Sequence, residues 1–129
     1  MNELNNTATS VGTYNNIPTA LTSNTSVVNI VDGLSLVKSA DKTNWSSGDL
    51  MYTITINNET ENNYEKPVIT DIIDTSLVTF IDGSVTIDGT KATSSEYKYD
   101  EQTHTLTVNL DTITPSSSST LTFLVKKKS

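Results

Sequence analysis

The chain has 129 residues, a formal net charge of −7 and no cysteine. Its sequence pI of about 4.4 argues against nucleic acid as a partner, because phosphates attract basic surfaces. Without cysteine the chain has no disulfide, thiol nucleophile or zinc–thiolate site. No apolar run approaches the ~20 residues that a membrane-spanning helix needs, and Met1–Thr9 is too polar for a signal peptide. The length fits one domain plus a tail.

Small polar residues dominate the composition. Threonine, serine and asparagine number 23, 16 and 13, together 52 of 129 residues. Threonine favours strands, whereas asparagine and serine favour turns. The composition therefore indicates a well-solvated β-protein.

The N-terminal segment has few large apolar residues. A weak strand is predicted over Ala8–Tyr14, a turn over Asn15–Pro18 and a further strand over Ser26–Val31, which Asp32–Gly33 interrupts. We expect residues 1–31 to be a linker or the end of a preceding unit, partly disordered, and residues 32–129 to form a domain.

The clearest pattern lies in Leu34–Asn57. Two alternating apolar and polar runs, Leu34–Lys38 and Leu50–Asn57, flank the polar stretch Asp41–Asp49. A period of two places Leu50, Tyr52, Ile54 and Ile56 on one face of a strand. This pattern is typical of an antiparallel sheet with one packed side.

Further short strands are predicted along the rest of the chain: Pro67–Asp74, Val78–Ile81, Ser84–Ile87, Tyr97–Tyr99, Thr105–Leu110 and Leu121–Val125. Asp82–Gly83 and Asp88–Gly89 are predicted turns. With about seven to nine strands and no predicted helix, we expect an all-β fold: an immunoglobulin-like antiparallel β-sandwich.

Residues 32–125 resemble a known family in the order of their motifs. In sequence order these motifs are LSLVKSADK (34–42), SGDLMYTITINN (47–58), PVITDIID (67–74), LVTFIDGSVTIDGT (77–90) and TLTVNLDTITPSSSSTLTFLVK (105–126). The family is the conserved repeat domain of bacterial surface proteins known as domain of unknown function eleven. The motif Asn6-Thr7-Ala8 is similar to the end of a preceding repeat, so we expect one repeat with the end of its upstream neighbour.

The resemblance implies a tandem module in a secreted protein held at a Gram-positive cell wall, with its anchor outside this sequence. Its partners would be neighbouring repeats of the same chain. We therefore expect a structural spacer or stalk repeat that supports adhesion, monomeric, not inserted in a membrane and without a cofactor. The alternative is an adhesion module that binds a glycan or host protein through strand-end loops.

One constellation suggests self-catalysed chemistry. Lys38 shares strand parity with Leu34 and Leu36, and Asp71 lies between Ile69 and Ile73, so both side chains are expected to point inward. Related surface sandwiches join such a lysine to an asparagine in an internal amide, with a nearby buried carboxylic acid, here Asp71, as the catalyst. The candidate asparagine is Asn109, although its strand parity is opposite to that of Leu106, Val108 and Leu110. The competing interpretation is that Lys38 is a surface or snorkelling side chain and that Asp71 is a hydrogen-bond acceptor beside a turn, because buried ionisable groups are usually paired non-covalently.

Other candidate sites are weaker. The aspartates suit calcium by chemistry, but no D-x-D-x-D-G loop is present, so no metal site is predicted. His104 is the single histidine and no serine lies in a nucleophile-elbow motif, so we do not expect an enzyme. Trp45 and Tyr64 lie in predicted loops and are candidate ligand contacts, although an aromatic there is more often a core plug.

Overall fold

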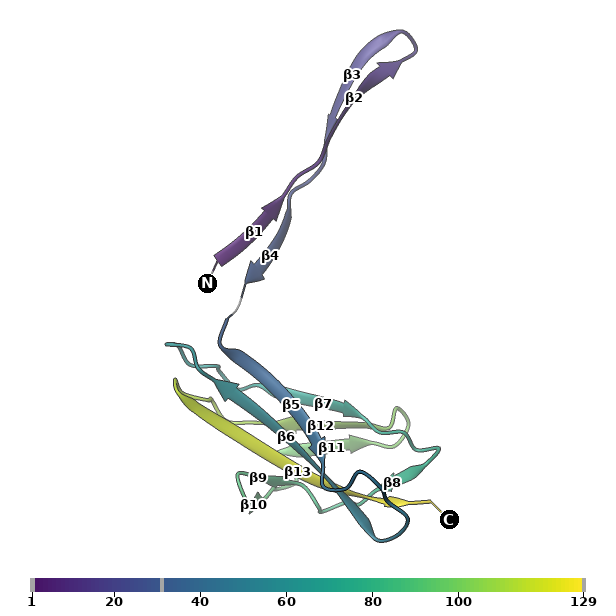
Figure 1. The fold of residues 1–129 in the computed structure, drawn as a ribbon, viewed down its shortest axis with the longest axis vertical. Coiled ribbons are helices and arrows are strands. Elements are labelled where there is room, and N and C mark those ends of the chain that lie inside the picture. Colours follow the sequence, from purple (N-terminus) through teal and green to yellow (C-terminus); the bar gives the residue numbers. More distant parts are fainter. Residues whose placement is uncertain (1, 31, 129) are drawn as a thin grey trace. The chain divides into compact units, whose positions relative to one another are not determined.

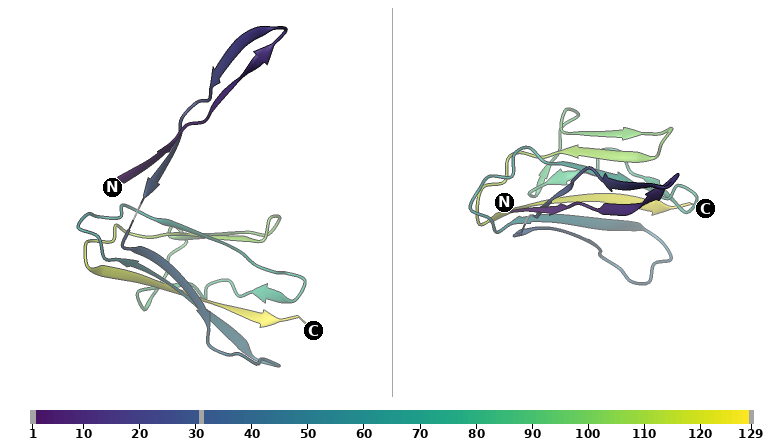
Figure 2. Two further views of the ribbon diagram at one scale, coloured as in Figure 1. Left: turned by 45° about the horizontal axis from the view of Figure 1, so that its top comes forward. Right: turned by 90° about the horizontal axis from the view of Figure 1, so that it is seen from above.

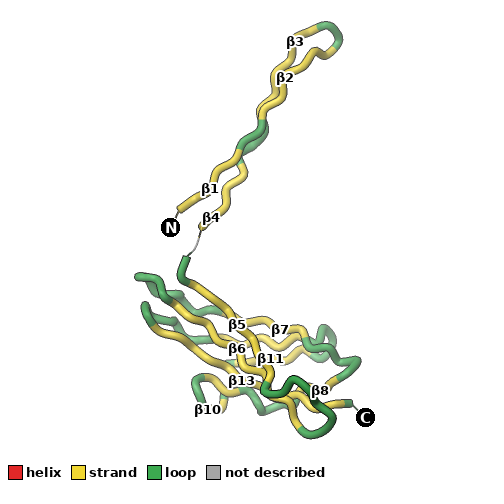
Figure 3. Tube along the Cα trace, in the orientation of Figure 1, coloured by secondary structure: helices red, strands yellow, loops and turns green. Residues whose placement is uncertain are grey.

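The computed structural model describes residues 2–30 and 32–128. Within them it contains 13 strands and no helix, as the colouring of Figure 3 shows, and no helical segment long and apolar enough to cross a membrane. The all-β prediction is confirmed. The chain divides into two compact units, Met1–Asp32 and Gly33–Ser129. This boundary lies one residue beyond the predicted one.

The first unit is a two-stranded antiparallel ribbon. Its strands are β1 (Asn2–Asn6), β2 (Thr9–Tyr14), β3 (Ile17–Thr22) and β4 (Ser26–Ile30). Strand β1 pairs with β4, and β2 pairs with β3. At the tip, Asn15 and Asn16 have φ of 50° and 65°, the left-handed values that a two-residue hairpin turn requires. The structure thus gives this segment four strands, of which two lie over the predicted Ala8–Tyr14 and Ser26–Val31. That the segment is a linker or the end of a preceding unit, partly disordered, stays a prediction.

The second unit contains the other nine strands: β5 (Leu34–Ala40), β6 (Asp49–Asn58), β7 (Val68–Ile72), β8 (Val78–Phe80), β9 (Thr86–Ile87), β10 (Thr90–Lys91), β11 (Tyr97–Asp100), β12 (Thr105–Asn109) and β13 (Ser117–Lys127). One sheet has the order β10-β9-β13-β6-β5, with β8 also paired to β13. The other has the order β11-β12-β7. Figures 1 and 2 show these sheets as two layers; the immunoglobulin-like form of this arrangement stays a prediction.

The hydrophobic core lies between the layers. Alternate residues of β6 and β13 point into it, as the period of two predicts, and the same holds for β12. The most completely buried apolar side chains are Phe123, Leu106, Leu121, Val85, Val108 and Val125. On the opposite face of the larger sheet, threonine hydroxyls pair across strands, Thr55 with Thr120 and Thr86 with Thr122. This face is polar, which explains the high threonine content of the strands.

Strand β6 is the centre of the larger sheet. It pairs antiparallel with β5 from Leu34↔Asn58 to Ala40↔Tyr52, and with β13 from Ser117↔Asn58 to Lys126↔Asp49. The first and last strands of the unit therefore run parallel to each other on either side of β6. The chain enters this unit at the Asn58 end of β6 and leaves it at the Asp49 end.

Both predicted Asp-Gly turns are present, whereas some strand limits differ: β13 begins at Ser117 and not at Leu121, and β9 covers only the last two residues of the predicted Ser84–Ile87. Asp82–Gly83 and Asp88–Gly89 are turns, and both glycines have positive φ. Thr90 and Lys91, which lie in none of the predicted strands, form β10, which pairs with β9. A two-residue strand is too short to leave a recognisable alternation in the sequence.

Candidate functional site

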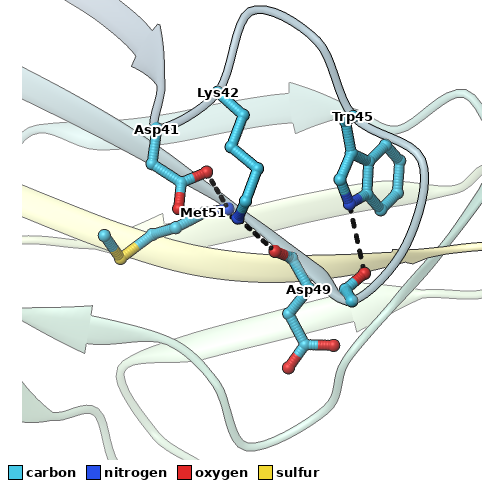
Figure 4. Close-up of polar contacts among 6 residues, drawn as sticks. Asp41, Lys42, Trp45, Asp49 and Met51 are labelled. Carbon is cyan, nitrogen blue, oxygen red and sulfur yellow. Dashed lines mark hydrogen bonds and ion pairs between the residues drawn. The ribbon is translucent and has the colours of Figure 1, made fainter.

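The loop between β5 and β6 is held by a local polar network, shown in Figure 4. The backbone N–H of Met51 donates to Asp41 Oδ1 at 3.0 Å, and Lys42 Nζ lies 3.2 Å from Asp41 Oδ2. Lys42 also donates to the carbonyl of Asp49 at 2.9 Å. The Met51 N–H, followed by Lys42, lowers the pKa of Asp41 from its ordinary value of 3.8. Asp41 is thus held as an anion that closes the base of the loop.

Trp45 occupies the middle of this loop. Its indole N–H donates to the carbonyl of Gly48 at 3.2 Å, and its ring packs against the hydrophobic core. Figure 4 shows the ring lying alongside the loop that carries it. Trp45 therefore covers the hydrophobic core at this loop, and the ring face that packs on the core is not accessible to a ligand.

Tyr64, the other aromatic proposed as a ligand contact, lies in the loop after β6 and is 38% exposed. Its backbone N–H and carbonyl form two hydrogen bonds of 2.9 Å with Ile113. Because the Trp45 and Tyr64 loops leave opposite ends of β6, about 30 Å apart at ~3.4 Å per residue, the two aromatics do not form one site.

Asn58 organises the loop that contains Tyr64. Its side chain is fully buried, and its amide donates to the carbonyls of Asn62 at 2.9 Å and Ile113 at 2.8 Å. Its Oδ1 accepts from the backbone N–H of Thr60 at 3.0 Å and from the Thr60 hydroxyl at 2.6 Å. The sequence does not reveal this role, since nothing local indicates that an asparagine at a strand end is buried.

Lys38 and Asp71 meet between the two sheets. Lys38 Nζ lies 2.7 Å from Asp71 Oδ2, with the Asp71 side chain 9% exposed and that of Lys38 43% exposed. The lysine cation also lies 4.5 Å from the ring centroid of Tyr52 and 6.0 Å from that of Phe123. An ion pair and a cation–π contact therefore connect edge strand β5 of one sheet with edge strand β7 of the other.

Asn109 does not join this pair. Asp71 pairs with Leu106, whose side chain is buried, whereas Asn109 pairs with Val68 on the opposite face of the same sheet. Asn109 is exposed there. The structure therefore brings together Lys38 and Asp71, but it does not bring Asn109 to them.

The aspartates considered for calcium are dispersed among separate turns. Asp74 accepts from the backbone N–H and hydroxyl of Ser76, and Asp100 accepts from the N–H groups of Gln102 and Thr103. These hydrogen bonds lower the pKa of both carboxyls. In the part of the chain that the structure describes, no group of three or more acidic or histidine side chains is placed to hold a metal.

A cleft that sequence reasoning missed lies beside β8 and β11, with a volume of about 540 Å³. Phe80, Tyr97 and Tyr99 form its aromatic wall. Tyr97 donates its hydroxyl to Asp82 at 2.7 Å, and this bond, with burial, raises the pKa of Tyr97. Burial also raises the pKa of Tyr99. In the sequence, Phe80, Tyr97 and Tyr99 lie on two short predicted strands at positions whose side chains are expected to face the core. Such a pattern does not distinguish the wall of a cleft from an ordinary hydrophobic core.

Comparison with known proteins gives no relative: no family model, curated protein or solved structure matches this chain.

Proposed function

We propose that residues 33–129 form a load-bearing spacer module of a bacterial cell-surface protein. The observation that carries this proposal is the path of the chain through the larger sheet. The unit begins with β5 and ends with β13, and both pair antiparallel with β6. The two points at which neighbouring segments attach therefore lie at opposite ends of one central strand, which suits modules joined end to end.

This arrangement loads the sheet in shear. A pull on the two ends acts along β5 and β13 in opposite directions. Ladder hydrogen bonds in an antiparallel sheet lie perpendicular to the strands, so all those of one strand pair must yield together. All seven residues of β5 and ten of the eleven residues of β13 are paired with β6. A unit loaded in this way resists extension better than one whose strands are peeled apart in turn.

The contact between Lys38 and Asp71 adds a connection between the sheets. It joins β5, the strand that first receives the load, to β7 in the other layer. Sliding of β5 along β6 separates this pair and removes Lys38 from the Tyr52 ring. The side-chain contacts therefore oppose the same motion as the backbone ladder.

The composition and the resemblance support an extracellular location. The chain carries a net charge of −7, which favours solubility of an exposed array. The resemblance of residues 32–125 to the repeat domain of bacterial surface proteins supports a stalk that presents an adhesive tip. In this proposal the module is monomeric, is not an enzyme, and has neighbouring repeats as its partners.

Single-molecule pulling in two geometries tests the mechanical role. The chain has no cysteine, so paired substitutions define the attachment points. Asp32→Cys with Lys128→Cys loads β5 and β13 in shear. Asp32→Cys with Glu59→Cys is the matched control, because residues 32 and 59 lie at the open end of the β5–β6 hairpin. We expect a severalfold higher unfolding force in the first geometry; equal forces would contradict the proposal.

A further inference from the structure

The aromatic cleft beside β8 and β11 has the features of a preformed binding site. Phe80 and Tyr99 stack with ring centroids 4.7 Å apart, and Phe80 packs in turn on Phe123 at 6.2 Å. Phe80 and Phe123 are buried, so Tyr99 is supported from within the core while its own ring is only partly covered. The wall of the cleft is therefore held in place before any ligand arrives.

Tyr97 is fixed in the same way. Its hydroxyl donates to Asp82 Oδ1 at 2.7 Å and accepts from the backbone N–H of Gly83 at 3.1 Å. Both bonds connect β11 to the turn after β8. Fixed side chains lose little conformational entropy when a ligand binds, so preorganisation of this kind favours affinity.

Polar groups surround the aromatic wall. Asp82 Oδ2 has no partner among the described residues, and it can accept a hydrogen bond from a ligand. The charges at the cleft nearly balance, with Asp82 and Glu101 set against Lys98 and Lys128, and with His104 beside them. A cleft without a strong net charge does not select a polyanion or a polycation.

We propose that this cleft binds a neutral saccharide. A pyranose presents an apolar C–H face that can pack on an aromatic ring, and hydroxyls at its rim that can both donate and accept. Partly exposed tyrosines supply the first contact, and the carboxylate of Asp82 supplies the second. The proposal rests on a different observation from the mechanical role, because the side chains that line the cleft carry it and the path of the chain through the larger sheet does not.

Titration of the full ¹⁵N-labelled chain with lactose, maltose, cellobiose and N,N′-diacetylchitobiose at millimolar concentrations tests this assignment. We expect saturable amide shifts for at least one sugar, centred on Gly83, Tyr97 and Tyr99. Tyr97→Ala removes the ring and should weaken binding about tenfold or more, whereas Tyr97→Phe keeps the ring and should weaken it less. Thermal midpoints of both variants establish that the fold persists.

Tyr64→Ala is the matched control, because it deletes an exposed tyrosine that does not line the cleft. It should leave the affinity unchanged. No saturable shift with any of the four sugars would overturn the proposal, as would shifts confined to residues outside the cleft. Saturable binding of short peptides at the cleft, with no response to the sugars, would overturn the ligand class in the same way.

Discussion

Lys38 and Asp71 form the one ion pair that connects the two sheets within the described residues, with 2.7 Å between Nζ and Oδ2. The carboxylate is almost buried, while the amine is reached by solvent and rests against the ring of Tyr52. Solvent screens the lysine, so the pair is worth less than its short distance suggests. Because it joins two edge strands of different sheets, the pair connects the sheets to each other, which an ion pair within one surface loop does not do.

A double-mutant cycle with Lys38→Met and Asp71→Asn measures this connection. Lys38→Met keeps the apolar stem and Asp71→Asn keeps the shape, so the cycle isolates the charge interaction. We expect a coupling of about 0.5–1.5 kcal/mol in denaturant unfolding, because one partner is buried and the other is not. The exposed pair Lys42–Asp41 is the control and should couple by less than about 0.5 kcal/mol. Equal coupling in the two cycles would show that the burial of Asp71 has no effect.

The intact mass of the folded chain tests for an internal amide. We expect the mass that the sequence requires, because the structure places Asn109 on the other face of its sheet and satisfies Lys38 by an ion pair. Loss of one ammonia would indicate a lysine–asparagine amide. Loss of one water, abolished by Asp71→Ala, would instead show that Lys38 and Asp71 condense.

Substitution of Asn58 should destabilise the second unit strongly. Asn58→Ala removes a fully buried amide that donates to the carbonyls of Asn62 and Ile113 and accepts from Thr60, so four hydrogen bonds are lost and a cavity is left. The expected loss is roughly 2–4 kcal/mol in the free energy of unfolding. Asn57→Ala is the matched control, since that side chain makes only a 3.4 Å contact with Ser35. Its cost should stay within about 0.5 kcal/mol, and a similar loss for both variants would contradict the network described for Asn58.

Stability should fall with acid below the ordinary aspartate pKa of 3.8. Asp41 and Asp100 accept backbone hydrogen bonds that lower their pKa in the folded state, and Asp74 accepts first the hydroxyl and then the backbone N–H of Ser76, which lower its pKa in the same way. A lowered folded pKa contributes stability above the unfolded value, and this contribution is lost as the pH falls through the folded value. Replacing all three by asparagine keeps an acceptor oxygen and removes the titration. Thermal midpoints of this variant should therefore depend less on pH in the acid range; an unchanged dependence would assign the acid sensitivity to other groups.

Amide exchange should distinguish the two units. The first unit contains only two-stranded pairing, and its large apolar side chains, such as Val11 and Leu21, are 85% and 64% exposed. A two-stranded ribbon is at best marginally stable in water, so its amides should exchange much faster than those of β6 and β13. Protection of β1–β4 equal to that of β6 would mean that the ribbon is covered by another surface in solution.

The sequence by itself determined the local features of this protein. The alternation in Leu50–Asn57 and Leu121–Val125 predicted which face of β6 and β13 is buried, because a period of two is a property of one strand and needs no partner. The turns at Asp82–Gly83 and Asp88–Gly89 were also predictable, because the preference of Asp-Gly pairs for turns depends on neighbouring residues alone. Strand parity also indicated that Lys38 and Asp71 point inward.

Tertiary structure decided which of these local features meet. Parity places Lys38 and Asp71 on inner faces, but only the stacking of β5 over β7 brings them to 2.7 Å. Trp45 and Tyr64 looked equivalent as loop aromatics, and the length of β6 separates them. Asn58 is buried because Ile113, distant in sequence, closes over it. The cleft arises in the same way, from β8 and β11, which belong to different sheets. Such pairings depend on long-range packing of many side chains, and a short window of sequence carries no information about them.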